Sequence, residues 1–205
     1  MQINSAITSH SYYQSAGASH KVPGNPAGEF SNAITKCEKE EGAGEFLGLT
    51  MLPEEGKSVT YGMRAMLSDK STLDRPIVQV ITNKDGKTEV FEVDISKVDP
   101  SNASRMEMFA LCCYEDKYGS GTGSTFGSFH TFRMYEETAI GNGCMKHTED
   151  GIPVWEQFRN EKVNWVKICE SVLDILQTIK DPKVMELFSK GKKLLNMYSR
   201  YELRE

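Results

Sequence analysis

Two adjacent cysteines and one histidine are the residues of this sequence that could form a nucleophile and its base. A catalytic thiol needs a lowered pKa and a base within hydrogen-bond reach. Cys113 follows Phe109 at helical spacing and so lies on an apolar stripe, which favours burial of this cysteine in the protein core. We therefore expect no catalytic residue, and an enzyme with a Cys–His site made by Cys112, Cys113 and His130 is the alternative.

A glycine-rich stretch, residues 119–127, could bind a small anion. Backbone N–H groups that lead into a helix N-terminus attract anions, and the ligand-binding residues would be Gly121, Thr122, Gly123 and Ser124. The stretch lacks the Lys and Ser/Thr ending of a phosphate loop, and it follows a predicted helix rather than a strand. We interpret it as a flexible helix–helix connection, with anion or ligand binding as the alternative.

Metal ligands and paired carboxylates lack the patterns that their chemistry requires. Cys144 and His147 have C-x₂-H spacing, but a structural zinc site needs four ligands and no second pair follows. We therefore expect no metal and no cofactor. Three acidic pairs lie in polar sequence and are expected on the solvated surface: Glu115-Asp116, Glu136-Glu137 and Glu149-Asp150.

The chain of 205 residues is long enough for one domain, which we place at residues 58–205. Residues 1–57 are polar and have poor periodicity, so we expect a mobile N-terminal arm with a short helix near residues 30–39. Alternating apolar residues over 58–97 predict an antiparallel meander of about three strands. Asn83 to Lys87 is a hairpin signal between the last two of them.

The spacing of apolar residues becomes helical after residue 100 and predicts helices over 100–143. Asp99 is the expected N-cap of the first helix, with Pro100 at its first position, and Ser124 is the expected cap of the second. The predicted buried residues are Met106, Phe109, Ala110 and Cys113 in the first helix, and Phe126, Phe129 and Phe132 in the second.

Residues 155–201 are expected to form a helical hairpin that breaks at Asp181-Pro182. Both halves carry apolar residues at alternating spacings of three and four, which are typical of a packed helical seam. Leu176 and Leu187 should each be buried on this seam, against the protein's own sheet or a partner. The predicted fold class is therefore α+β, a small antiparallel meander packed with about four helices.

Composition limits the compartment and the partners. The five cysteines are odd in number, so we expect reduced thiols rather than a disulfide framework. The N-terminus has no apolar signal segment, which predicts a cytoplasmic protein, with export without a cleaved signal peptide as the alternative. The net charge of −5 argues against a nucleic-acid partner, and the sequence has no apolar run long enough for a membrane span.

The middle of the chain resembles an uncharacterised family of bacterial proteins found largely in gut Clostridia. The resemblance covers roughly residues 59–143. It rests on residues 61–67 (YGMRAML), 76–80 (PIVQV), the stretch from Val98-Asp99-Pro100 to 107–111 (EMFAL), and 125–127 (TFG). Members are similar in having a polar N-terminal leader. The resemblance implies a recurring domain of unknown function and no catalytic residue.

These observations predict a non-enzymatic, soluble bacterial protein that acts by binding another protein or a second copy of itself. The two-helix seam and the polar arm favour this function. A Cys–His enzyme near residues 119–127 and a small-anion or ligand binder at that loop are the two alternatives.

Overall fold

The computed structural model describes residues 44–53, 60–84, 87–145 and 154–202. These residues belong to one compact unit, Gly44–Glu205. The predictions for residues 1–43, for His147 and for Glu149-Asp150 lie outside the described residues. Within them, no helix is both long enough and apolar enough to cross a lipid bilayer.

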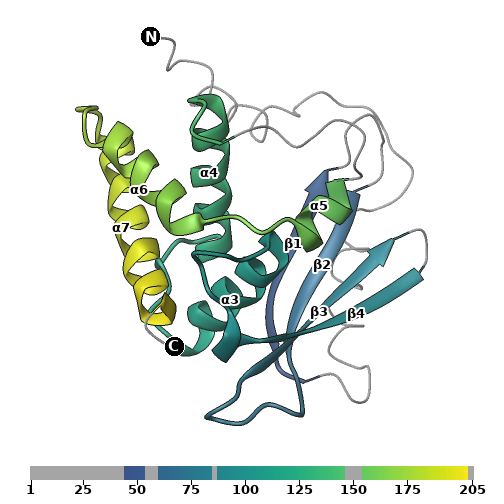
Figure 1. The fold of residues 1–205 in the computed structure, drawn as a ribbon. Coiled ribbons are helices and arrows are strands. Elements are labelled where there is room, and N and C mark those ends of the chain that lie inside the picture. The colour runs from purple at the N-terminus through teal and green to yellow at the C-terminus, as the bar shows by residue number, and fades with distance from the viewer. Residues whose placement is uncertain (1–43, 54–59, 85–86, 146–153, 203–205) are drawn as a thin grey trace, which may run out of the picture. The chain divides into compact units, whose positions relative to one another are not determined.

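A four-stranded antiparallel sheet forms one layer of the unit, with the strands in chain order (Figure 1). The α+β fold is confirmed, but the sheet has four strands and not three. Its strands are β1 (Phe46–Pro53), β2 (Thr60–Leu67), β3 (Ile77–Lys84) and β4 (Lys87–Asp94). The predicted hairpin at residues 83–87 is confirmed, because Lys84 pairs with Lys87.

The additional strand, β1, lies inside residues 1–57, so the expectation of a mobile arm is wrong for this part of the chain. Phe46 pairs with Met66 and Gly48 pairs with Ala65, which places a bulge between Phe46 and Gly48. A bulge inserts one unpaired residue and shifts the alternation of side chains between the two faces. In the sequence, Leu47, Leu49 and Met51 alternate with Gly48 and Thr50. Leu47 packs against the core, whereas Leu49 and Met51 are exposed, so this alternation does not mark one buried face.

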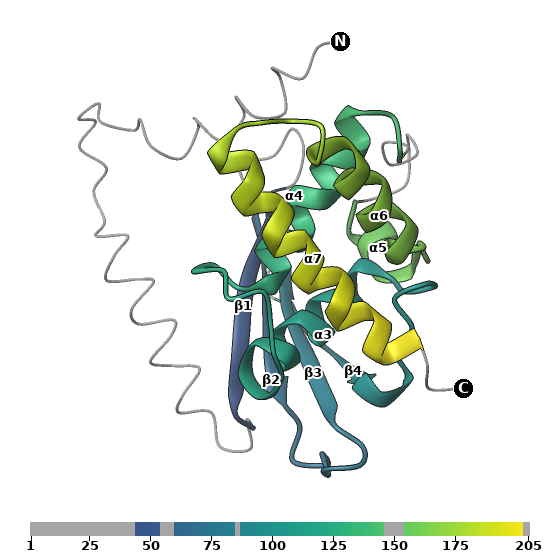
Figure 2. The same ribbon diagram turned by 90° about the vertical axis from the view of Figure 1, so that its left-hand side faces the viewer.

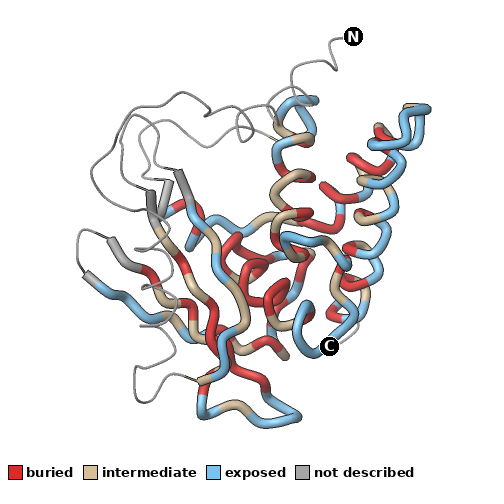
Figure 3. Tube along the Cα trace, turned by 180° about the vertical axis from the view of Figure 1, so that it is seen from behind, coloured by how far each residue is buried: buried red, intermediate tan, exposed pale blue. Residues whose placement is uncertain are grey.

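The two faces of the sheet differ in burial. One face carries Met63, Ala65, Val78 and Val80, none of which is exposed to solvent. Helix α3 (Arg105–Tyr118) packs against β1, β2 and β3, and Figure 3 shows most of this helix as buried. Residues that pair across neighbouring antiparallel strands point to the same face. The opposite face therefore carries a row in which no residue is buried: Leu49, Arg64, Ile81 and Val90.

Helix α3 begins later than predicted, after a 3-10 turn at Ile95–Lys97. Ser104 is its N-cap: the Ser104 hydroxyl accepts from the backbone of Glu107, and the Glu107 carboxylate accepts from the backbone of Ser104. Asp99 instead accepts a hydrogen bond from the backbone of Ser101 at 2.8 Å in the preceding turn. The prediction of Asp99 as N-cap is wrong, because the capping box satisfies two helix N–H groups where one aspartate would satisfy one. All four residues predicted to be buried in α3 are buried.

Helix α4 (Ser128–Gly141) also begins later than predicted. Its N-cap is Gly127, with φ +82°, and not Ser124. Phe126 therefore lies before the helix and is 78% exposed, whereas Phe129 and Phe132 are buried as predicted. The capping function is supplied from another helix, because the Asp116 carboxylate accepts from the backbone N–H of Ser128 at 2.6 Å.

The C-terminal helices are α5 (Val154–Asn160), α6 (Trp165–Leu176) and α7 (Pro182–Glu202). The break at Asp181-Pro182 is confirmed, and α6 and α7 lie side by side in both views (Figures 1 and 2). Both helices pack against α4, so the apolar seam faces the protein's own helices rather than the sheet. Leu176 is buried as predicted, but Leu187 is only partly buried.

Candidate functional sites

The thiols of the sequence-derived Cys–His alternative lie in the core. Cys112 and Cys113 are both buried in α3. Burial raises the pKa of both thiols well above the ordinary value, and the neighbouring Asp116 acts in the same direction. His130 is half-buried on α4, where its ring makes an edge contact with Phe126, 5.3 Å between centroids. Because the thiolate is the nucleophile, this environment does not favour a catalytic cysteine.

The backbone of the glycine-rich stretch is turned toward the protein's own oxygens. Gly121 donates its N–H to the Glu115 carbonyl, and Thr122 donates to the Ser128 hydroxyl at 2.7 Å. The Asp116 carboxylate accepts from both the backbone and the hydroxyl of Ser128, at the N-terminus of α4. An external anion would have to displace this carboxylate, so the loop geometry does not favour the anion-binding alternative.

Two of the acidic residues expected on the surface are buried. The side chains of Glu115 and Glu136 are 5% and 2% exposed. Glu115 accepts from Arg200 at 2.7 Å and also from Tyr201, whereas Glu136 pairs with Arg105 and Arg133. The surface prediction is wrong for these two glutamates, because Arg200, which pairs with Glu115, and Arg105, the buried partner of Glu136, lie 85 and 31 residues away in the sequence. Asp116 and Glu137 are exposed, as predicted.

Arg105 is the centre of the larger of the two buried ionic clusters. Its guanidinium donates to Glu136 and Glu161 and lies 5.5 Å from the ring centroid of Trp165. Burial opposes the charge of Arg105, but the two carboxylates outweigh it and raise the pKa of the guanidinium. The Trp165 indole donates to the carbonyl of Ala103 at 2.8 Å. These contacts join α3, α4 and the segment before α6, which assigns the cluster a structural role.

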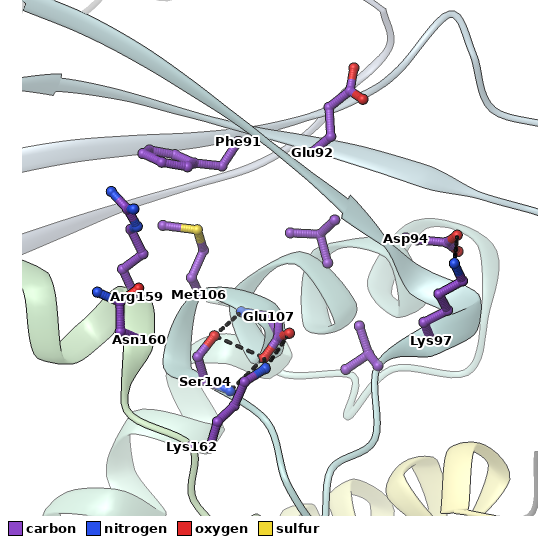
Figure 4. A pocket seen from close by; sticks show the side chains of 12 residues that line it. Phe91, Glu92, Asp94, Lys97, Ser104, Met106, Glu107, Arg159, Asn160 and Lys162 are labelled. Atoms are coloured by element: carbon purple, nitrogen blue, oxygen red, sulfur yellow. Dashed lines mark hydrogen bonds and ion pairs between the residues drawn. The ribbon is translucent and has the colours of Figure 1, made fainter. Parts of the chain in front are cut away.

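A groove of about 480 Å³ lies between β4 and the start of α3, with the end of α5 beside it (Figure 4). Its apolar lining residues are Phe91, Val93, Val98 and Met106. Its charged lining residues are Glu92, Asp94, Lys97, Glu107, Arg159 and Lys162. Ser104 and Asn160 complete the lining, and the capping residues Ser104 and Glu107 thus also form part of the groove wall.

The edge of β1 is a second candidate site. In the part of the chain that the structure describes, no strand pairs with this edge. Phe46, Leu49 and Met51 are 47%, 45% and 55% exposed, so β1 presents large apolar side chains to solvent. The eight residues of β1 (FLGLTMLP) include no charged side chain.

No family model, no curated protein and no solved structure matches this chain. The resemblance over residues 59–143 to a clostridial family therefore stays a prediction. Four cysteines form no disulfide in the described ranges: Cys112, Cys113, Cys144 and Cys169. No group of three or more His, Cys, Asp or Glu residues in these ranges is placed to hold a metal ion.

Sequence reasoning missed both surfaces. The groove combines β4 with residues 159–162, and no spacing in the sequence brings these segments together. The β1 edge had a signal that sequence reasoning did not use: eight consecutive uncharged residues, five of them apolar, that end at Pro53.

Proposed function

We propose that this protein acts by self-association, through pairing of β1 in one copy with β1 in a second copy. The observation that carries the proposal is the uncharged apolar edge strand. An exposed edge of eight residues offers a row of backbone hydrogen-bonding groups to another strand. The proposal follows the expectation of a non-enzymatic binding protein but moves the contact from the helical seam to the sheet, because the seam packs within the monomer.

The two edges of the sheet differ in the feature that prevents pairing. Proteins commonly protect an exposed edge strand with charged side chains. The β4 edge carries four charged residues: Lys87, Glu89, Glu92 and Asp94. The β1 edge carries none, so it has no electrostatic barrier to a second strand.

Pairing between two copies is chemically self-complementary. A twofold axis places each β1 antiparallel to its copy, so each surface patch contacts the same patch. Residues opposite one another share a face, so Leu49, which points outward, must lie opposite another outward residue. A register centred on Thr50 satisfies this condition and places Leu49 of each copy opposite Met51 of the other. No like charges meet, and the exposed apolar side chains of the two copies cover one another.

The test is the mass of the full chain in solution. Sedimentation velocity at about 100 µM should give twice the mass of the chain, because association depends on protein concentration. The double variant Leu49→Lys/Met51→Lys should give the monomer mass, since it places lysines opposite lysines across the twofold axis. Circular dichroism should show that this variant keeps the wild-type helix and strand content, because both positions are exposed.

The matched control is Val90→Lys, which adds a lysine at a 53% exposed position on the same sheet face, but on β4. It should remain a dimer. A wild-type monomer at about 100 µM would overturn the proposal. So would a dimer that Val90→Lys disrupts as strongly as the β1 double variant does.

A further inference from the structure

We infer that the groove between β4 and α3 binds a small amphiphile with a carboxylate head and an unbranched alkyl chain, with the carboxylate at Arg159. This site is independent of the proposed self-association, because the groove lies at the β4 edge of the sheet and the association at the β1 edge. Its volume of about 480 Å³ falls within the range of small-molecule sites.

The floor of the groove suits an alkyl chain. Val93, Val98 and Met106 are buried and line the groove, so their apolar atoms form its base. Figure 4 shows the Met106 side chain directed toward Phe91 and Arg159, whereas Asp94 and Lys97 lie at the opposite end. Burial of apolar surface is favourable in proportion to the area removed from water, so a chain laid along this floor would be held by it.

The carboxylates of the groove lining are already paired with cations. Glu92 accepts from Lys70 at 2.6 Å and Asp94 accepts from Arg75 at 2.7 Å, so both acids are neutralised by residues outside the lining. The hydrogen bond from Lys70 lowers the pKa of Glu92 below its ordinary value, which keeps this acid ionised and paired. In Figure 4, Glu92 also points away from the groove.

The third carboxylate, Glu107, is held by its own neighbours. It accepts from Lys162 at 2.5 Å and from the backbone of Ser104 at 2.6 Å. The three acids thus have one close lysine or arginine partner each, and two cations of the lining, Lys97 and Arg159, are in excess. The Lys97 ammonium lies 3.8 Å from the Asp94 carboxylate, whereas Arg75 contacts the same carboxylate at 2.7 Å.

Arg159 is placed to receive an anion. Its guanidinium carbon lies 4.9 Å from the centroid of the Phe91 ring, and among the described residues no carboxylate lies within ion-pair distance of it. A cation–π contact of this kind uses no guanidinium N–H as a hydrogen-bond donor to an anion, so these groups can serve a planar, two-oxygen acceptor. A carboxylate at this point would have the apolar floor directly beside it.

The experiment uses the full chain and sodium octanoate as the probe, followed by the methionine methyl signals in NMR. The Met106 methyl signal should shift saturably as octanoate is added. Each buried methylene contributes about 0.8 kcal/mol, so hexanoate should bind up to about fifteenfold more weakly. Octanol, which lacks the charge, should bind at least about tenfold more weakly than octanoate.

The variant that tests the head group is Arg159→Gln, which should weaken octanoate binding about tenfold and leave octanol binding unchanged. The matched control, Lys183→Gln, removes an exposed positive charge on α7 and should not change either affinity. The inference is overturned by equal affinities for octanol and octanoate, by unchanged octanoate binding in Arg159→Gln, or by no saturable Met106 shift up to about 10 mM octanoate.

Discussion

Arg105 on α3 and Glu136 on α4 form an ion pair in which the side chains are 5% and 2% exposed. A buried ion pair costs desolvation energy, and removal of one partner leaves the other charge buried and uncompensated. Here Arg133 and Glu161 extend the pair at both ends, where their side chains are 30% and 45% exposed. The cluster therefore connects the core to the surface through charges of alternating sign.

The first prediction concerns this pair. Arg105→Met should lower the free energy of unfolding by ~3 kcal/mol or more, because Glu136 keeps its buried charge but loses its closest buried partner. Urea unfolding followed by tryptophan fluorescence measures the change. The control is Lys190→Met, which removes a partly exposed pair with Glu186 on α7 and should cost ~0.5 kcal/mol or less. Equal losses in the two variants would show that burial does not set the cost.

The second prediction uses the difference between two leucines of the hairpin. Leu176 is 4% exposed, so Leu176→Ala should destabilise the protein by ~2–5 kcal/mol through lost burial and the cavity left behind. Leu187 is only partly buried, so Leu187→Ala should cost less, ~1–2 kcal/mol. Thermal or urea unfolding gives both values. Alanine at the exposed Lys180 and Lys192 should change stability by ~0.5 kcal/mol or less, and a larger effect at Lys192 would contradict the orientation of α7.

The parts of the fold that could be predicted are those that depend on residues close in sequence. The hairpin at residues 83–87 and the break at Asp181-Pro182 follow from the turn and helix-start preferences of single residues. The apolar stripe of α6 follows from the period of the helix. Local preferences do not decide where α3 begins, because both Asp99-Pro100 and Ser104 with Glu107 can start a helix. Only one of these two starts packs α3 on the sheet.

The candidate sites could not be predicted because they depend on contacts between distant residues. Glu136 is polar in every local sequence measure, and only the fold places Arg105 beside it. The groove likewise forms when β4 meets the last residues of α5 and Lys162, which follows that helix. For β1, the alternating residues Leu47, Leu49 and Met51 were present in the sequence, but only Leu47 packs against the core and the other two are exposed, so the pattern does not identify a buried face.

The third prediction concerns Gly191, a helical position where a side chain has no room. A Cβ atom at this glycine would lie 1.6 Å from the Tyr135 hydroxyl oxygen, which donates to the Leu187 carbonyl. Alanine in a helix is normally more stable than glycine by ~1 kcal/mol. Here Gly191→Ala should instead destabilise the protein by ~1–3 kcal/mol, because Tyr135 must move. A rise in the melting temperature would show that α7 does not approach α4 as closely as described; Lys192→Ala is the control on the same helix.

The fourth prediction concerns thiol reactivity. Among the described cysteines, Cys144 is exposed, and burial protects Cys112, Cys113 and Cys169. In a Cys37→Ser variant, an aromatic disulfide reagent at pH 8 should modify one thiol quickly and three only after urea is added, because protonated buried thiols react slowly. Mass spectrometry of the modified peptides identifies the site. Rapid labelling of Cys112 or Cys113 in the native protein would instead revive the Cys–His alternative.

The last prediction follows from the pH dependence of one of these thiols. Burial raises the pKa of Cys169 from its ordinary value of 9.0 to about 12 in the folded protein. Above pH 9 the unfolded chain has lost this proton while the folded chain keeps it, so the unfolded state binds fewer protons and stability falls as the pH rises. This thiol therefore contributes a loss of about 1.4 kcal/mol per pH unit between pH 9 and 12, and none below pH 9.

Cys169→Ala tests this contribution, because it removes this thiol and no other titratable group. The difference in the free energy of unfolding between wild type and Cys169→Ala should be constant from pH 6 to 8 and should then shift in favour of the variant. Urea unfolding at pH 8 and pH 10, with a reductant present, measures it. Cys144→Ala, which removes an exposed thiol from the segment after α4, is the control substitution measured beside it. A difference that stays constant through pH 10 would mean that the Cys169 thiol reaches solvent in the folded protein.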